Sequence, residues 1–87
     1  MALQIKLLKQ PKEFLERTDR KTKEAILKHF AQLSENPFAF PLSKPLRQRP
    51  ERCCRVGNYR ILFLVVEEDA VLLIVIIGDR RDVYQYK

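Results

Sequence analysis

Apolar and polar residues alternate at the start of the chain. Leu3, Ile5 and Leu7 are separated by polar residues, and an apolar residue at every second position is the pattern of a strand with one buried face. The pattern therefore predicts a short, half-buried strand over residues 2–8.

Two helices are predicted after this strand. Pro11 suits the first turn of a helix over residues 11–18, and Asp19 can cap a second helix over residues 20–35. The second helix has apolar residues at helical spacing, which predict its buried face: Ile26, Leu27, Phe30 and Leu33. Together the two helices form a predicted helical hairpin.

The second half of the chain predicts three strands. A Gly-Asn dipeptide separates the runs 52–56 and 59–66, which is the signal of a two-residue hairpin. The acidic residues 67–69 form the next turn, and residues 70–77 form a last long strand. The preceding segment, residues 42–52, is basic and interrupted by prolines, and we expect an exposed loop there.

The predicted order β-α-α-β-β-β gives an α+β fold, with a small, mainly antiparallel sheet packed on an N-terminal helical hairpin. We expect a single domain over residues 1–87.

The last two strands are apolar on both faces, whereas one helical hairpin can cover only one face. Sheet curvature, the N-terminal helix, a second copy of the chain or a partner protein could cover the other face. Central strands of a small sheet can also be this apolar for packing alone. A permanent protein partner is the interpretation we favour, because an exposed apolar face would promote aggregation.

Charge and cysteine content narrow the class of protein. The chain has 17 Lys and Arg against 11 Asp and Glu, a net charge of +6, which favours an anionic partner such as nucleic acid, a membrane surface or an acidic protein. The only cysteines, Cys53 and Cys54, are adjacent in a predicted strand, so they point to opposite faces and neither pair nor share a metal. We expect no metal, no cofactor and a reduced, cytoplasmic protein. No signal peptide is expected, and the apolar runs are far below the ~20 residues of a membrane helix.

Two short motifs carry a family resemblance. RVGNYRILF, residues 55–63, and IIGDRRDVYQY, residues 76–86, resemble the R-x-G-x-Y-R-[IVL] and G-x-R-x-[DE]-[VI]-Y elements of the RelE/ParE superfamily of toxins. The resemblance covers nearly the whole chain and implies a RelE-like microbial ribonuclease-type fold. It also implies the toxin of a type II toxin–antitoxin system, whose RelE branch cleaves mRNA in the ribosomal A site.

The resemblance also implies residue roles for a metal-independent endoribonuclease. Arg60 matches the arginine that binds the scissile phosphate, Arg80 matches a second phosphate clamp or proton-donor partner, and Tyr84 matches a tyrosine that stacks on a base or assists proton transfer. These three are the expected catalytic residues. The expected RNA-binding residues are the other cations and a second tyrosine: Lys44, Arg47, Arg49, Arg52, Arg55, Arg81 and Tyr86.

Each of these residues also has a structural interpretation. Arg60 could pair with Asp79 or Asp82, the two tyrosines could be packing residues, and the basic loop could be a solvated face.

The sequence departs from the family at Cys53 and Asp79, where relatives commonly carry basic residues or histidine. The general base therefore stays unidentified. Lys44 or one of the tyrosines, Tyr84 or Tyr86, could serve, whereas His29 lies far from the arginines in sequence.

The partners implied by the resemblance are a RelB-like antitoxin that covers the sheet face, the ribosome and mRNA. Operator DNA is expected to be bound only through the antitoxin, and no membrane is expected. Two alternatives stay open: a ParE-like inhibitor of DNA gyrase, which the basic residue missing at Cys53 favours, and a weakened toxin that acts mainly as antitoxin partner and co-repressor.

Overall fold

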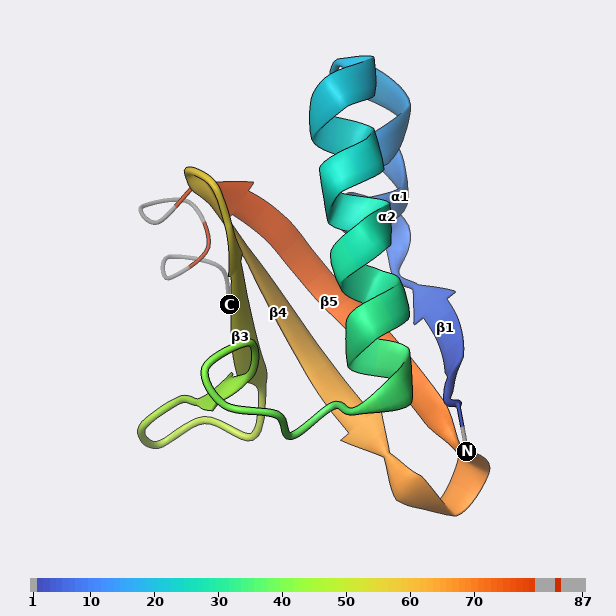
Figure 1. Ribbon diagram of the computed structural model, residues 1–87, viewed down its shortest axis with the longest axis vertical. Helices are drawn as coiled ribbons and strands as arrows, with labels where there is room; N and C mark the ends of the chain where they lie inside the picture. Colours follow the sequence, from blue (N-terminus) through green and yellow to red (C-terminus); the bar gives the residue numbers. More distant parts are fainter. Residues whose placement is uncertain (1, 80–82, 84–87) are drawn as a thin grey trace.

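The computed structural model describes residues 2–79 and residue 83, which form one five-stranded sheet with two helices on one side of it (Figure 1). The helices are α1 (Lys9–Arg17) and α2 (Arg20–Glu35). The strands are β1 (Gln4–Leu7), β2 (Lys44–Pro45), β3 (Arg52–Val56), β4 (Tyr59–Val66) and β5 (Val71–Asp79). A 3₁₀ turn, η1 (Glu67–Asp69), joins β4 to β5.

The strand order in the sheet is β1-β5-β4-β3-β2. β1 runs parallel to β5 and the other neighbours are antiparallel, so the expected α+β fold with a mainly antiparallel sheet is confirmed. The two-residue strand β2 is an addition to the predicted order. It lies in the segment expected to be a loop, where Lys44 pairs with Cys53 across from β3.

The expectation of a half-buried N-terminal strand is wrong. All four residues of β1 are exposed, and Ile5 and Leu7 each keep 37% of their surface accessible. β1 is an edge strand with a neighbour on one side only, so its side chains gain less cover than those of the central strands. In this segment it is Leu3, just before β1, that packs against the core.

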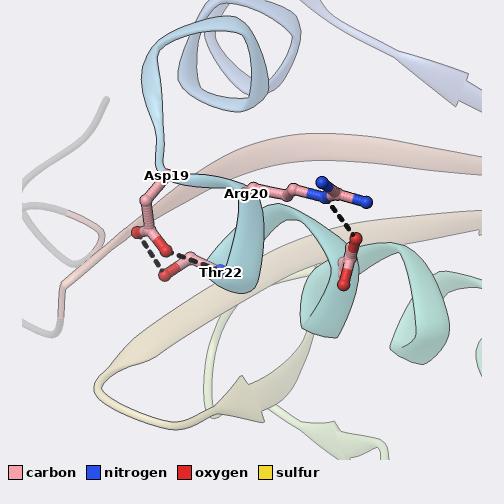
Figure 2. A network of polar contacts seen from close by, with 4 residues as sticks. Asp19, Arg20 and Thr22 are labelled. Carbon is pink, nitrogen blue, oxygen red and sulfur yellow. Dashed lines mark hydrogen bonds and ion pairs between the residues drawn. The ribbon is translucent and has the colours of Figure 1, made fainter.

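Asp19 caps α2, as the sequence predicted. Its carboxylate accepts hydrogen bonds from the backbone N–H of Thr22 at 3.0 Å and from the Thr22 hydroxyl at 2.6 Å (Figure 2). These bonds stabilise the ionised form and lower the pKa of Asp19. Arg20 and Glu24, one turn apart, form an exposed ion pair at 3.0 Å.

The buried face of α2 is narrower than its apolar pattern suggested. Ile26, Phe30 and Leu33 are buried, but Leu27 is 44% exposed because its position, about 100° around the helix from Ile26, turns it away from the sheet. Within the described residues, no helix is both long and apolar enough to cross a membrane.

The hairpin of β3 and β4 has the bounds that the sequence predicted. Its two-residue turn depends on Gly57, whose φ of +58° lies in the left-handed region that glycine tolerates best. The turn fixes the register of the two strands and places Val56 opposite Tyr59.

Two apolar clusters lie on the two faces of the sheet. The larger one joins both helices to β3, β4 and β5. On the other face Leu62 and Ile76 are 0% and 4% exposed, and they pack with Val83, Leu46 and Cys53 of the same chain. The chain itself therefore covers this part of the second face, a cover that the sequence pattern did not indicate.

Candidate functional site

Arg55 and Arg60 are direct cross-strand neighbours on β3 and β4. Cys54 and Ile61, next to them along each strand, belong to the core under the helices. Because successive side chains point to opposite faces of a sheet, both arginines lie on the face away from the helices. The two guanidinium groups therefore add their positive charge to the same part of this face.

A cavity of 380 Å³ opens where Lys44 joins the two arginines. Lys44 reaches the site because β2 places it next to Cys53. The remaining lining is apolar or weakly polar: Pro41, Leu42, Pro45, Leu46 and Cys53. Among the residues that the structure describes, none that lines this cavity is acidic.

The three cations keep access to solvent. Lys44 and Arg55 are exposed and Arg60 is half-buried. The Arg55 Nε donates to the Gly57 carbonyl oxygen at 3.3 Å. This hydrogen bond orients the guanidinium, but it does not neutralise the positive charge, because a carbonyl group carries no net charge. Among the described lining residues every charged group is a cation, and a concave site of this kind with an apolar wall focuses the electrostatic field on an incoming anion.

The other basic residues of the expected RNA-binding set lie elsewhere. The Arg52 Nε donates to the Ser43 hydroxyl at 2.7 Å, and its guanidinium lies 5.1 Å from the centre of the Phe38 ring. Arg49 forms an ion pair with Glu51 at 3.1 Å. Arg47 is exposed on the loop before β3. Strand alternation could have separated Arg52 from Arg55, because Arg52 shares the side of the core residue Cys54.

Four of the expected site residues lie outside the described residues: Arg80, Arg81, Tyr84 and Tyr86. Gly78, the cross-strand neighbour of Arg60, lies near the end of β5. Asp79 follows as the exposed last residue of that strand. The His29 ring lies on α2, with its Nδ1 atom 2.8 Å from the Ala25 carbonyl oxygen.

The two cysteines have opposite environments, as expected from their adjacency. Neither forms a disulfide bond. Cys54 is fully buried in the core, and burial together with the neighbouring Cys53 raises its pKa to about 12. Cys53 is half-buried and lines the cavity beside Arg55 and Arg60.

Gln10 is a residue that the sequence analysis missed. Its side-chain amide donates to the Ile77 carbonyl at 2.7 Å and accepts from the Ile77 N–H at 2.9 Å. The pairing of β1 with β5 ends at Leu7, opposite Ile74. Beyond that point the Gln10 side chain makes the hydrogen bonds to β5 that a neighbouring strand would otherwise make. The bonds fix the end of β5 close to Gly78, and no local pattern signals a contact between residues so far apart in sequence.

Comparison with known proteins assigns the chain to a class. A family model described as ParE toxin of type II toxin-antitoxin system, parDE, matches residues 5–84. No curated protein sequence matches the chain.

Solved structures share the fold at low sequence identity. A mutant of Escherichia coli toxin RelE in the free state is 22% identical with a TM-score of 0.79, covering 98% of this chain and 93% of that one. The toxin–antitoxin complex RelBE2 from Mycobacterium tuberculosis has 22% identity and a TM-score of 0.78, covering 92% and 100%. An archaeal RelE–RelB complex from Pyrococcus horikoshii has 20% identity and a TM-score of 0.74, covering 92% and 97%.

Proposed function

Because the chain belongs to the ParE toxin family of type II toxin–antitoxin systems, within the RelE/ParE superfamily, we propose that it is a ribosome-dependent endoribonuclease that cleaves mRNA in the A site. The observation that carries this proposal is the cavity in which Lys44, Arg55 and Arg60 converge. Its size and charge suit a phosphodiester group with part of a nucleotide.

The proposed chemistry needs no metal. The 2′-hydroxyl of one nucleotide gives its proton to a general base, and its oxygen attacks the adjacent phosphorus to form a phosphorane. The bond from phosphorus to the 5′-oxygen of the next nucleotide then breaks, and that oxygen takes up a proton from a general acid. The products are a 2′,3′-cyclic phosphate and a 5′-hydroxyl. Arg60 stabilises the charge on the non-bridging oxygens through its fixed fork of N–H donors. Arg55 holds the same phosphate from the facing strand, and Lys44 contributes a third positive charge at the rim.

Two further roles complete the proposal and come from the family motif. Arg80 is the second clamp on the phosphate, and Tyr84 stacks on a base or assists proton transfer. The general base is left unassigned, with Tyr84 and Tyr86 as candidates; Lys44 is a third candidate only in its neutral form, in which it would not supply the charge at the rim. Alignment of the RNA by the ribosome supplies part of the rate, because a fixed in-line geometry removes much of the entropic barrier.

The proposed partner in the cell is an antitoxin. The solved complexes from Mycobacterium tuberculosis and Pyrococcus horikoshii pair the similar chain with an antitoxin. On this chain Leu64 and Leu73 face each other on the sheet face away from the helices and are only half-buried. We place a RelB-like antitoxin over this part of the face, with operator DNA reached through it.

Inhibition of DNA gyrase is the second candidate function. It is favoured by the family model, which carries the ParE name, and by the uncharged Cys53 at a position where RNA-cleaving relatives commonly carry a cation. In this case the chain binds its target protein and breaks no RNA.

One experiment separates the two candidates. The purified chain is added to ribosomes that carry a defined mRNA with an empty A site, and primer extension maps any cut; the same preparation is tested in a gyrase supercoiling assay. A cut within the A-site codon with normal supercoiling is the result we expect. Intact mRNA together with inhibited supercoiling would contradict the endoribonuclease proposal and support inhibition of DNA gyrase.

A further inference from the structure

Phe40 is the most exposed large apolar residue among those that the structure describes. It keeps 78% of its surface accessible on the loop 36–43, which connects α2 to β2. Single exposed apolar side chains are common on protein surfaces and need no function. What distinguishes Phe40 is the set of groups around it.

The Phe40 ring lies beside a residue that lines the cavity of Lys44, Arg55 and Arg60, which we call the cationic cavity. The Lys44 ammonium lies 5.6 Å from the centre of the ring, and Lys44 also lines the cavity with Arg55 and Arg60. Pro41, the residue after Phe40, lines the same cavity. An accessible aromatic ring therefore lies next to Lys44, which is one of the three cations of the cavity.

This combination is the one that binds single-stranded nucleic acid. Such sites join a positively charged groove, which holds the phosphates, to aromatic side chains on which the bases stack. We infer that Phe40 is a stacking platform for an unpaired base of the RNA whose phosphate lies between Arg55 and Arg60. This inference rests on the proposed function and adds a base-binding subsite to it.

A nucleotide can interact with the Phe40 ring and the Lys44 ammonium group at the same time. Its base offers a flat π surface to Phe40, and its phosphate offers a charge to Lys44. An apolar side chain of a protein partner would bury the ring beside Lys44 without offering an anion to its ammonium group, and loss of water around an unpaired charge is costly. Nucleic acid is therefore the occupant that the local charge favours over an apolar protein surface.

Phe38 provides a matched control on the same loop. It is 49% exposed and also carries a cation over its ring, since the Arg52 guanidinium lies 5.1 Å from the ring centre. However, Phe38 lines a different cavity, together with Arg49 and Glu51, that contains neither Arg55 nor Arg60. A general effect of losing an exposed phenylalanine would appear at both positions, whereas loss of a stacking platform would appear only at Phe40.

The test is a binding cycle with a short RNA. Fluorescence anisotropy measures the affinity of the full chain for labelled RNA hexanucleotides. Their riboses carry 2′-O-methyl groups, which prevent cleavage. One hexanucleotide has all its bases, and in each of the others a single base is removed, at each position in turn. Wild-type protein is expected to lose about tenfold in affinity when one particular base is removed. Phe40→Ala should lose the same factor on the complete RNA and become insensitive to that removal, while Phe40→Trp and Phe38→Ala should behave like the wild type.

The outcomes are distinct from those of the cleavage experiment, because the RNA cannot be cut. The inference would be overturned if Phe40→Ala lost the same factor in affinity, relative to the wild type, for the complete RNA and for the base-deleted RNA. It would also be overturned if the wild type had no measurable RNA affinity at low salt. An unchanged RNA affinity with weakened binding of the antitoxin would also overturn it and make the ring a protein contact. Base-sensitive binding without any cleavage on ribosomes would retain the stacking site and reject the nuclease.

Discussion

At Cys53 and Cys54, two adjacent thiols differ in reactivity because the strand turns them to opposite faces. The thiolate is the reactive form, and Cys54 is buried with its pKa raised to about 12, whereas Cys53 lines an open cavity. We predict that N-ethylmaleimide modifies Cys53 in the folded protein and Cys54 only after unfolding. Mass spectrometry of the native and denatured protein measures both.

The same reaction reports on the site. Because Cys53 lines the cavity with Arg55 and Arg60, its adduct should occupy part of the cavity beside the two arginines and strongly reduce mRNA cleavage. The variant Cys53→Ala should cleave and should resist the reagent. Full activity of a protein modified at Cys53 would argue that RNA does not enter this cavity.

At the residue scale, strand alternation predicted the faces of the two cysteines correctly. Opposite faces for Cys53 and Cys54 follow from their adjacency, and that prediction is confirmed. Alternation applied to Arg52 would also have placed it away from Arg55. The contact of Phe40 with Lys44 had no such signal, because a loop between two prolines has no fixed period.

At the scale of the element, the start of α2 depends on the charge of Asp19. Its pKa is lowered from 3.8 mainly by the hydrogen bonds from Thr22, so the folded state binds the proton less tightly than the unfolded state does. The stabilising contribution is therefore complete above the unfolded pKa and is lost as the pH falls through the folded pKa.

Urea unfolding monitored by circular dichroism measures this dependence. We predict that Asp19→Ala is less stable than the wild type at pH 7 and that the difference shrinks below about pH 4. Asp19→Asn keeps a capping side chain that does not titrate and serves as the control. A difference between Asp19→Ala and wild type that stays constant down to acid pH would contradict the capping account.

The end of β5 depends on Gln10. Replacing Gln10 with Leu removes both hydrogen bonds to Ile77 and should lower the free energy of unfolding by about 1–3 kcal/mol. Gln32→Leu, the same change at an exposed position of α2, should have little effect in the same urea titration.

Gln10→Glu sharpens the comparison. An ionised carboxylate still accepts from the Ile77 N–H but cannot donate to the Ile77 carbonyl, whereas a protonated carboxyl can do both. The variant should therefore recover part of its lost stability as the pH falls toward about 4. If Gln10→Leu and Gln32→Leu unfolded at the same urea concentration, the proposed anchor of β5 would be wrong.

Local patterns predicted β3, β4 and the capped start of α2, because turn and cap residues act over a few positions. They failed where distant segments decide the outcome. β2 forms only because β3 offers an edge to Lys44, and β1 stays exposed because it is itself an edge.

At the scale of the whole molecule, the two faces of the sheet differ in composition. The helix-covered face holds most of the core, whereas the opposite face carries Arg55, Arg60 and the cationic cavity next to a small apolar cluster. Cations and partly buried apolar residues therefore share this face. The proposed function gives this face two partners, RNA in the active protein and the antitoxin in the inhibited one.

The central claim is that Arg55 and Arg60 bind the scissile phosphate of mRNA. Its most direct test is the single-turnover rate of A-site cleavage on programmed ribosomes for the wild type and for Arg60→Ala, Arg55→Ala and Arg20→Ala, the last of which removes an exposed arginine on the helical side. We predict a loss of about 10²–10³-fold for Arg60→Ala, a smaller loss for Arg55→Ala and a near wild-type rate for Arg20→Ala, with unchanged circular dichroism. Equal rates for Arg60→Ala and Arg20→Ala would contradict the account.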